Sequence, residues 1–572
     1  MYLWREWGEK KIVKRKLYEY PDTCYLKPII HKHTLVMQIK RLLNLSLLLA
    51  TGLLLSWAPA NPKPNIIIIM ADDMGYSDIG CFGSEIKTPN LDALAKDGLR
   101  MTQFYNASRC CPSRAALLTG LYPHQAGVGH MVNEREHPSY RGMLNKNCVT
   151  IAEALKAGVY STFMAGKWHL NARPEQWPRK RGFDRYFGLL DGANSHFGNR
   201  PYRPNQKLTY LLDDTEYTPG PNFYSSDAYT HYAIQFIQEN KTKSQPFFLY
   251  LAYTAPHWPL HALPADIAKY KGKYLKGWDK LREERYQRLL SMGIIDKSTK
   301  LSPRDEEVPA WETLSAAGKK AWDEKMAVYA AMVDRMDQNI GKLRQTLTQI
   351  GADKNTIIMF LSDNGGSHED IGGTSFTPEI RAANNKPASD PTSFTAYEYE
   401  GANLSNTPFR KYKHLEHEGG IATPFIAYYP GVIKGGSLNH QPAHITDLMA
   451  TCLELAGVKY PETYQGNVIK PLEGISLMPL FKGQQWAGHK AIYFEHEGNR
   501  AVRQGDWKLL SSYPENKWEL YNLKTDRTEL HDLSQSQPEK VKALASLYDA
   551  WASRAGVVPF AQLVQMDKEK KK

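Results

Sequence analysis

The sequence has little cysteine and no long apolar run. Six of its 572 residues are cysteines, and the five that follow residue 60 are irregularly spaced, which argues against a fold built on disulfides. The apolar run Leu42–Trp57 is 16 residues long, shorter than the roughly 20 that a membrane-spanning helix needs. The mean hydropathy of −0.51 excludes a polytopic membrane protein. There is no internal repeat, and low complexity is confined to the terminal lysines.

The net charge of +12 would suit a nucleic-acid binder. Residues 1–60 carry +6 of this charge and residues 566–572 carry +2, which leaves +4 for residues 61–565. No motif of basic and aromatic residues accompanies that modest excess. We therefore predict that nucleic acid is not a partner.

The N-terminal region has the features of an export signal. Lys40 and Arg41 precede the apolar run, and Ala58-Pro59-Ala60 follows it; a basic start, a short apolar core and an A-x-A site are typical of a secretory signal peptide. We expect translation from Met37, a mature start near Asn61, and a periplasmic or secreted protein without stable membrane insertion. An uncleaved N-terminal anchor is the alternative; no cysteine follows the run to carry a lipid.

Apolar, β-branched runs alternate with helical patterns over some 400 residues. This alternation predicts an α/β fold with a large, mostly parallel mixed sheet between two layers of helices. Strands are expected at 65–70, 161–165, 246–253, 355–361 and 424–429, and helices at 90–97, 150–157, 323–350 and 445–456.

The pattern changes past residue 485. Four short strands are expected at 492–495, 501–503, 507–511 and 518–522, followed by a helix at 538–552. We therefore predict an N-terminal extension with its signal (1–60), a large domain (61–484), and a C-terminal subdomain with a four-stranded antiparallel sheet, a helix and a basic tail (485–572). Two long polar stretches, 261–320 and 366–406, are expected to form lids or walls of a site.

Polar residues follow four of the predicted strands. They are Asp72-Asp73, Gly166-Lys167-Trp168-His169, Pro256-His257 and Asp363-Asn364. Because ligands of open α/β sheets bind beyond the carboxyl ends of the strands, we expect these groups to meet in one site. The four acid and amide side chains offer only oxygen, which suits Ca²⁺ or Mg²⁺ rather than Zn²⁺. Either pair alone would equally suit a turn or a helix cap.

The most specific motif runs from Cys110 to Gly120, Cys-Cys-Pro-Ser-Arg-Ala-Ala-Leu-Leu-Thr-Gly. Pro112 suits the first turn of a helix, whose N-terminus favours an anion beside residue 110, and Arg114 can bind an oxyanion through two N–H groups. The segment resembles the signature C-x-P-S-R-x(4)-T-G of the type I sulfatases, which have an alkaline-phosphatase-like fold. The resemblance extends from about residue 64 to 550. It implies that a formylglycine-generating maturation enzyme converts Cys110 to Cα-formylglycine.

The same resemblance implies roles for other residues. Asp72, Asp73, Asp363 and Asn364, together with residue 110, would bind one Ca²⁺, with Mg²⁺ as an option, and Asp363 would also act as a base. Gly166–Leu170 is similar to the family's G-K-W-H-L segment. By this likeness Lys167 holds the sulfate and aldehyde oxygens, and His169 takes the proton whose loss expels sulfate; its ordinary pKa near neutrality suits that step.

Two further residues would lie near the leaving oxygen. His257 fits the family histidine, with His261 as the alternative. Lys413 stands at the family's spacing before Glu418-Gly419-Gly420, with Lys411 as the alternative, although His414 and His417 replace the small residues common there.

The resemblance implies a sulfatase that acts on sulfate monoesters, by our interpretation on a carbohydrate and in an exo fashion. The hydrated aldehyde would attack sulfur, form a covalent sulfate ester and eject sulfate through its second hydroxyl. Two alternatives remain: a phosphonate monoester or phosphodiester hydrolase with the same formylglycine, and a non-catalytic protein that binds sulfated glycans. Candidates for contact with the substrate are Asp191–His196, His130, His496 and Arg500.

Overall fold

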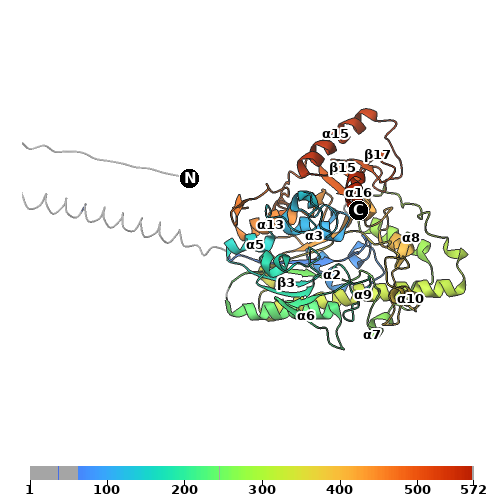
Figure 1. Cartoon of the computed structure of the whole chain (residues 1–572), viewed down its shortest axis with the longest axis horizontal. Coiled ribbons are helices and arrows are strands. Elements are labelled where there is room, and N and C mark those ends of the chain that lie inside the picture. Colours follow the sequence, from blue (N-terminus) through green and yellow to red (C-terminus); the bar gives the residue numbers. More distant parts are fainter. Residues whose placement is uncertain (1–36, 38–61, 244, 570–572) are drawn as a thin grey trace, which may run out of the picture. The chain divides into compact units, whose positions relative to one another are not determined.

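The computed structural model describes residues 37, 62–243 and 245–569 (Figure 1). The predicted signal peptide beyond Met37, the residues ahead of it and the last three lysines lie outside the described residues. Residues from Lys63 onward form one compact unit, and the predicted boundary between 484 and 485 stays a prediction.

A central sheet organises this unit, in the order β10-β2-β9-β8-β1-β7-β3-β4-β5-β6, with β11 beside β2. Its strands are β1 (Asn65–Ala71), β2 (Leu99–Tyr105), β3 (Ser161–Gly166), β4 (Arg185–Leu189), β5 (Tyr210–Leu212), β6 (Thr215–Tyr217), β7 (Phe247–Ala252), β8 (Thr356–Ser362), β9 (Ala422–Tyr428), β10 (Ser437–Asn439) and β11 (Ala443–His444).

The middle of the sheet is parallel. Strand β1 pairs in parallel with β7 and with β8, and β3 pairs in parallel with β7 and β4. All five of the predicted strands form here, so the predicted α/β class is confirmed. The four strands followed by polar residues, β1, β3, β7 and β8, run in one direction, so their carboxyl ends share an edge.

Strand β9 runs against the parallel majority of this mixed sheet. Its sequence resembles that of the parallel strands, yet β9 pairs antiparallel with β8 and with β2. An apolar run shows that a strand is buried but not which way it runs. As a consequence, the residues that precede β9, rather than those that follow it, reach the edge formed by the ends of β1, β3, β7 and β8.

Helices cover both faces of the sheet (Figure 1). On β1, Ile67 and Ile69 belong to one apolar core, whereas Ile66 and Ile68 belong to the core on the opposite face, as the two-residue period of a strand requires. The first core contains α2 (Pro89–Lys96), α6 (Ser225–Asn240), α8 (Trp278–Ser291) and the long α9 (Ala316–Gln349). The second contains α3 (Cys110–Thr119), α5 (Ile151–Leu155), α13 (Asp447–Ala456) and α14 (Met478–Phe481).

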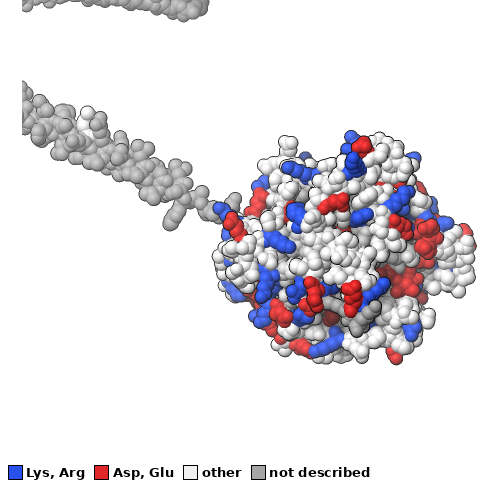
Figure 2. Space-filling view, turned by 45° about the horizontal axis from the view of Figure 1, so that its top comes forward, with Lys and Arg blue, Asp and Glu red and all other residues white. Residues whose placement is uncertain are grey.

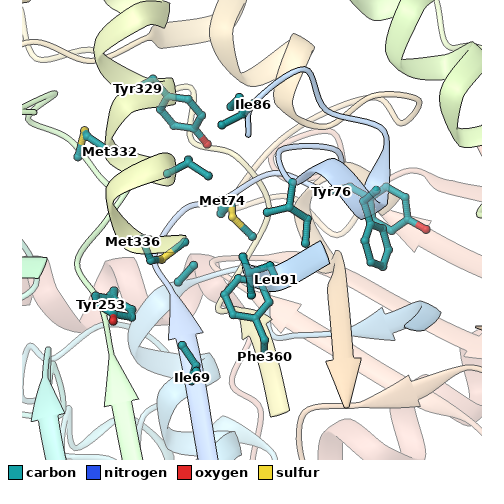
Figure 3. Packing of buried hydrophobic residues seen from close by; sticks show 14 of the residues in the cluster. Ile69, Met74, Tyr76, Ile86, Leu91, Tyr253, Tyr329, Met332, Met336 and Phe360 are labelled. Atoms are coloured by element: carbon teal, nitrogen blue, oxygen red, sulfur yellow. The ribbon is translucent and has the colours of Figure 1, made fainter. Parts of the chain in front are cut away.

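Helix α9 contributes to the core on one face of the parallel strands. Figure 3 shows Met336 of α9 between Met332 of the same helix and Ile69 of β1, with Phe360 of β8 in the same cluster, and all four side chains are fully buried. At about 25 cal/mol per Å² of apolar surface, such residues contribute strongly to holding the strand ends in place.

The C-terminal region contains the predicted antiparallel sheet. It comprises β14 (Ile492–His496), β15 (Asn499–Gln504), β16 (Trp507–Ser511) and β17 (Trp518–Asn522), with α15 (Pro538–Ala555) packed on it and α16 (Phe560–Glu569) following. The remaining elements are α4 (Pro123–Ala126), α7 (Pro264–Ile267), α10 (Pro378–Asn384), α11 (Glu398–Ser405), α12 (Glu418–Ile421), β12 (Thr463–Tyr464) and β13 (Asn467–Val468).

The surface and the cysteines agree with the composition. On the face drawn in Figure 2, acidic and basic side chains are mixed. Within the described ranges no helix has both the length and the apolar character needed to cross a membrane. The five cysteines found there are buried and free.

Candidate active site

The polar residues that follow β1, β3 and β8 meet at one edge of the sheet. Lys167 Nζ donates to Asp72 Oδ2 over 2.7 Å. Arg114, one turn into α3, donates to Asp363 Oδ2 over 2.7 Å and lies 3.5 Å from Asp72 Oδ1. All four side chains are fully buried, so these charges interact in a medium that screens them poorly.

A second set of contacts surrounds Asp73. Its Oδ1 accepts from the Asn364 amide over 2.7 Å, and its Oδ2 accepts from Lys413 Nζ over 2.8 Å and lies 3.3 Å from His257 Nε2. Lys413 reaches this position because it precedes the antiparallel strand β9. Burial alone would raise the pKa of Asp73, but Lys413 and His257 hold it below its usual value.

Two oxygen atoms at this edge lack a hydrogen-bond partner and could bind a cation. Asp72 Oδ1 and Asn364 Oδ1 are buried and have no hydrogen-bond partner among the described residues. One ligand atom from each of Asp72, Asp73 and His257 lies within 4.8 Å of the others. Burial, with the Asp72 carboxylate next, raises the pKa of Asp363 to about 8. A divalent cation fits this set, because it would pair with the free oxygens and offset the crowded carboxylates.

Asp363 and His257 have further contacts at this edge. His257, which we expect near the leaving oxygen, also offers a ligand atom close to those of Asp72 and Asp73. Asp363 accepts from Arg114 and, over 3.2 Å, from the Asp73 backbone N–H. Sequence position shows that both residues reach this edge, but the partner of each depends on packing.

Cys110 is the first residue of α3 and is 3% exposed. A hydrogen bond from Cys111 and the nearby Lys167 and His169 hold the pKa of the Cys110 thiol well below its usual value. Burial lowers the pKa of His169 to about 4, so its imidazole is neutral at pH 7 and can accept a proton. Gly192 packs against this ring, and a Cβ there would lie 2.5 Å from it.

A cavity of about 540 Å³ opens over these groups. Cys110, His169, His257 and Lys413 line its floor. The walls come from residues 131–133, 171–172 and 190–193, with Tyr202, Arg203, Gln206 and Trp258. Of the two long polar stretches expected as walls, 366–406 contributes Glu369 and 261–320 contributes no lining residue, because much of it folds into α7, α8 and the start of α9.

Several candidates for substrate contact are not in the cavity lining. Asp191 lines the cavity, as do the two residues after it. His196 is buried and bonds to Ser225 Oγ and the His257 carbonyl. The other three expected residues, His130, His496 and Arg500, also lie outside the lining.

The alternatives to His257 and Lys413 lie elsewhere. His261 bonds to the Ser393 carbonyl over 2.9 Å, and Lys411 pairs with Asp305 over 3.1 Å. Neither lines the cavity, whereas His257 and Lys413 do.

Sequence reasoning missed Glu369, Arg109 and Trp258. Glu369 lies 3.0 Å from Lys413 Nζ and 3.1 Å from Arg109 Nη2, and it accepts from Trp258 Nε1 over 2.8 Å. All three line the cavity. Nothing in the sequence distinguishes Glu369 from the acid beside it, although Arg109 and Trp258 could have been found as neighbours of Cys110 and His257.

Known proteins are similar to this chain in sequence and in fold. Residues 64–458 match the family model Sulfatase, and residues 409–550 match the model N-sulphoglucosamine sulphohydrolase, C-terminal. An arylsulfatase of Klebsiella aerogenes is 38% identical over 445 residues, covering 76% of this chain and 95% of that protein. The N-acetylgalactosamine-6-sulfatase of Mus musculus is 31% identical over 500 residues, covering 84% and 78%.

A solved structure agrees with these matches. The crystal structure of Ps i-CgsB has a TM-score of 0.62 and 28% identity, covering 86% of this chain and 93% of that one. The chain thus belongs to the sulfatase family and is a sulfuric ester hydrolase.

Proposed function

We propose that the protein removes sulfate from a sulfated carbohydrate as an exo-acting enzyme. The observation that carries this proposal is the cavity of about 540 Å³ with Cys110, His169, His257 and Lys413 on its floor. Its volume is typical of a site for a small ligand, which suits a terminal sugar. Tyr202 and Trp258 line the cavity and give it aromatic surface for such a ring.

The names of similar proteins point the same way. One matched relative is an N-acetylgalactosamine-6-sulfatase. Ps i-CgsB also has a crystal structure in complex with k-i-k-neocarrahexaose. These ligands belong to those proteins, and they support a carbohydrate as the substrate class here.

We propose that residue 110 acts as Cα-formylglycine, formed from Cys110 by a maturation enzyme. When present, this group would supply a hydroxyl nucleophile for sulfur, the S–O bond to the alcohol would break as the new one forms, and the alcohol would leave with a proton. The surroundings fit an oxygen-bearing group, because Lys167 and Arg114 place positive charge beside a helix N-terminus. The neutral His169 accepts the proton at its ring as sulfate leaves.

The other residues bind and orient the sulfate ester. Asp72, Asp73, Asp363 and Asn364 would hold Ca²⁺, or Mg²⁺ in its place, with His257 at the edge of the set. The ion would supply charge stabilisation for the sulfate oxygens. Lys413 and His257 line the cavity and face the leaving oxygen, where a cation stabilises developing negative charge.

Peptide mass spectrometry of the protein from its native host tests the modification. Conversion removes the mass of H₂S from the peptide with residue 110 and adds one oxygen. We expect Cys110→Ala to abolish sulfatase activity with the fold retained, and the matched variant Cys111→Ala to keep it. An unmodified thiol at position 110 in active protein would refute the formylglycine proposal.

Two kinetic comparisons test the substrate. Defined monosulfated sugars identify the sugar and the position of the sulfate, and activity on none of them but on aryl sulfates would contradict a carbohydrate substrate. On one leaving group, kcat/KM for the sulfate ester should exceed that for phosphonate and phosphate esters. A preference for phosphorus would favour the alternative hydrolase, and absence of all turnover in matured protein would favour a glycan-binding role.

We also propose that the protein is exported to the periplasm or secreted through its N-terminal signal. N-terminal sequencing of protein from the culture medium or the periplasm should find a start near Asn61. Recovery only from the cytoplasm, with residues 37–60 intact, would contradict export.

A further inference from the structure

Three segments that are distant in sequence bring histidines to one carboxylate outside the cavity. Glu497 lies in the turn between β14 and β15. His130 Nε2 lies 2.7 Å from Glu497 Oε1, and His414 Nε2 contacts Glu497 Oε2. His496, the last residue of β14, places its Nε2 3.7 Å from Glu497 Oε1. Its ring centroid is 5.1 Å from that of His414 and 5.8 Å from that of His130.

The most telling member of the cluster is His496. Its side chain is fully buried, and neither ring nitrogen has a hydrogen-bond partner among the described residues. Buried polar groups in native proteins are almost always satisfied, so an imidazole without a partner calls for a ligand. Burial holds the pKa of His496 well below its usual value, which leaves the ring neutral, the form that ligates a metal.

The geometry of the cluster suits a metal ion. Ligand atoms of His414, His496 and Glu497 all lie within 4.8 Å of one another, and a tetrahedral Zn²⁺ holds its ligand atoms about 3.3 Å apart, so small side-chain shifts close the set. Both His414 and Glu497 have positive φ values, 88° and 52°, a conformation uncommon for residues other than glycine. The His414 side chain is 33% exposed, which gives an ion a path from solvent.

We propose that His414, His496 and Glu497 bind a zinc-class divalent cation, with His130 orienting the Glu497 carboxylate. Two imidazoles and one carboxylate favour Zn²⁺ over Ca²⁺ or Mg²⁺, and three protein ligands leave a fourth position for water. The site is separate in chemistry from the oxygen-rich set around Asp72 and does not depend on the proposed substrate.

The position of this site links it to the cavity. His414 follows Lys413, and His130 precedes Met131; both of these neighbours line the cavity. His496 and Glu497 belong to the C-terminal sheet. A bound ion would therefore tie two cavity-lining segments to that sheet and hold them in a single arrangement.

Calorimetric titration tests the site on full-length mature protein. After removal of metals with a chelator and dialysis, the protein is saturated with Ca²⁺ and titrated with Zn²⁺. We expect one Zn²⁺ equivalent and a rise in Tm, and Co²⁺ in its place should give the visible absorption of tetrahedral coordination. The Asp73→Asn variant should behave in the same way, because it changes only the oxygen-rich set.

Variants separate a metal site from a hydrogen-bonded network. His414→Gln and His496→Gln should lose the Zn²⁺ equivalent and the Co²⁺ spectrum, and His130→Gln should weaken binding roughly 10- to 100-fold. His531→Gln, at a histidine whose side chain is 66% exposed, is the matched control and should bind normally. If His496→Gln fails to fold, Zn²⁺ binding by His414→Gln provides the test, because His414 is partly exposed. If the wild-type protein takes up no Zn²⁺, or if His414→Gln takes up as much Zn²⁺ as the wild-type protein, the proposal is wrong.

Discussion

Glu369 accepts a hydrogen bond from Lys413 Nζ over 3.0 Å at the floor of the cavity. The other carboxylate oxygen lies 3.1 Å from Arg109 Nη2. Burial opposes the charge on Glu369, but Lys413 and Arg109 hold its pKa well below the usual value. One carboxylate thus pairs with two cations, Lys413 and Arg109, that line the cavity.

We predict that Glu369→Gln lowers kcat/KM for sulfate esters by about tenfold or more. Hydrogen bonds to charged groups contribute about 1.5–3 kcal/mol, and about 1.4 kcal/mol corresponds to tenfold in rate. Steady-state kinetics of the matured enzyme measure the effect. Glu379→Gln, at an exposed position in α10, is the control, and equal kcat/KM for both variants would contradict a positioning role.

Asn364→Ala should weaken Ca²⁺ binding and remove most of the stability that Ca²⁺ adds. The substitution deletes the unpaired Oδ1 and the 2.7 Å hydrogen bond to Asp73. For the wild-type protein, Ca²⁺ at 100 times its Kd should raise the free energy of unfolding by about 2.7 kcal/mol. Calorimetric titration and Tm measurements, with Asn385→Ala of exposed Asn385 as control, test this. A full Tm rise in Asn364→Ala would exclude Asn364 as a ligand.

Asp191 should make the stability depend on pH. Burial raises its pKa to about 6 from the ordinary 3.8, and it accepts one hydrogen bond, from Thr209 N. Since the folded-state pKa is the higher one, protonation stabilises the fold fully below about pH 3.8, and this contribution is lost as pH rises through 6.

Asp191→Asn mimics the protonated form. We therefore expect its free energy of unfolding, relative to that of the wild-type protein, to increase as the pH is raised from 4.5 to 7.5. The gain is at most about 3 kcal/mol, because each pKa unit corresponds to about 1.4 kcal/mol. Urea denaturation at both pH values measures it. Asp549→Asn, at an exposed site, should show no such trend, and a pH-independent difference for Asp191→Asn would refute the assignment.

Lys508→Met should destabilise the protein by about 3–5 kcal/mol. Lys508 of β16 is fully buried and bonds to Glu418 Oε1 over 3.1 Å and to Glu529 Oε1 over 2.7 Å, so its loss leaves two buried carboxylates without this cation. The shift in urea midpoint, compared with Lys524→Met at an exposed position, gives the value. If the free energy of unfolding falls by less than about 1 kcal/mol, Arg527, which lies 3.3 Å from Glu418, is enough to neutralise the buried carboxylates without Lys508.

Much of the fold could be predicted from local sequence. The run Asn65–Met70 is apolar in every position after Asn65 because β1 is buried on both faces, and the same holds for β7 and β8. The four C-terminal strands are short and separated by turn residues, so the sequence pattern predicted them. Strands β2, β4, β5 and β6 were missed: β2 and β6 mix polar and apolar residues, and β4, β5 and β6 are no longer than five residues.

The candidate site could be predicted only in part. Asp72, Lys167 and Asp363 follow recognisable strands, and Cys110 lies in a specific motif. Glu369 belongs to no motif, and its role arises from its contacts with Lys413 and Arg109. His196 and His496 resembled cavity residues in sequence, yet the structure places one under the His257 carbonyl and the other in a separate cluster.

The sequence by itself determined the family, the alternation of strand and helix, and the residue types at the ends of β1, β3, β7 and β8. These features are encoded by neighbouring residues and by local burial. Only the tertiary structure decided that β9 runs antiparallel, so that Lys413 reaches Asp73, and that His130, His414 and Glu497 meet. Those contacts join segments tens to hundreds of residues apart, and they form only because packing of the two cores fixes where each segment lies.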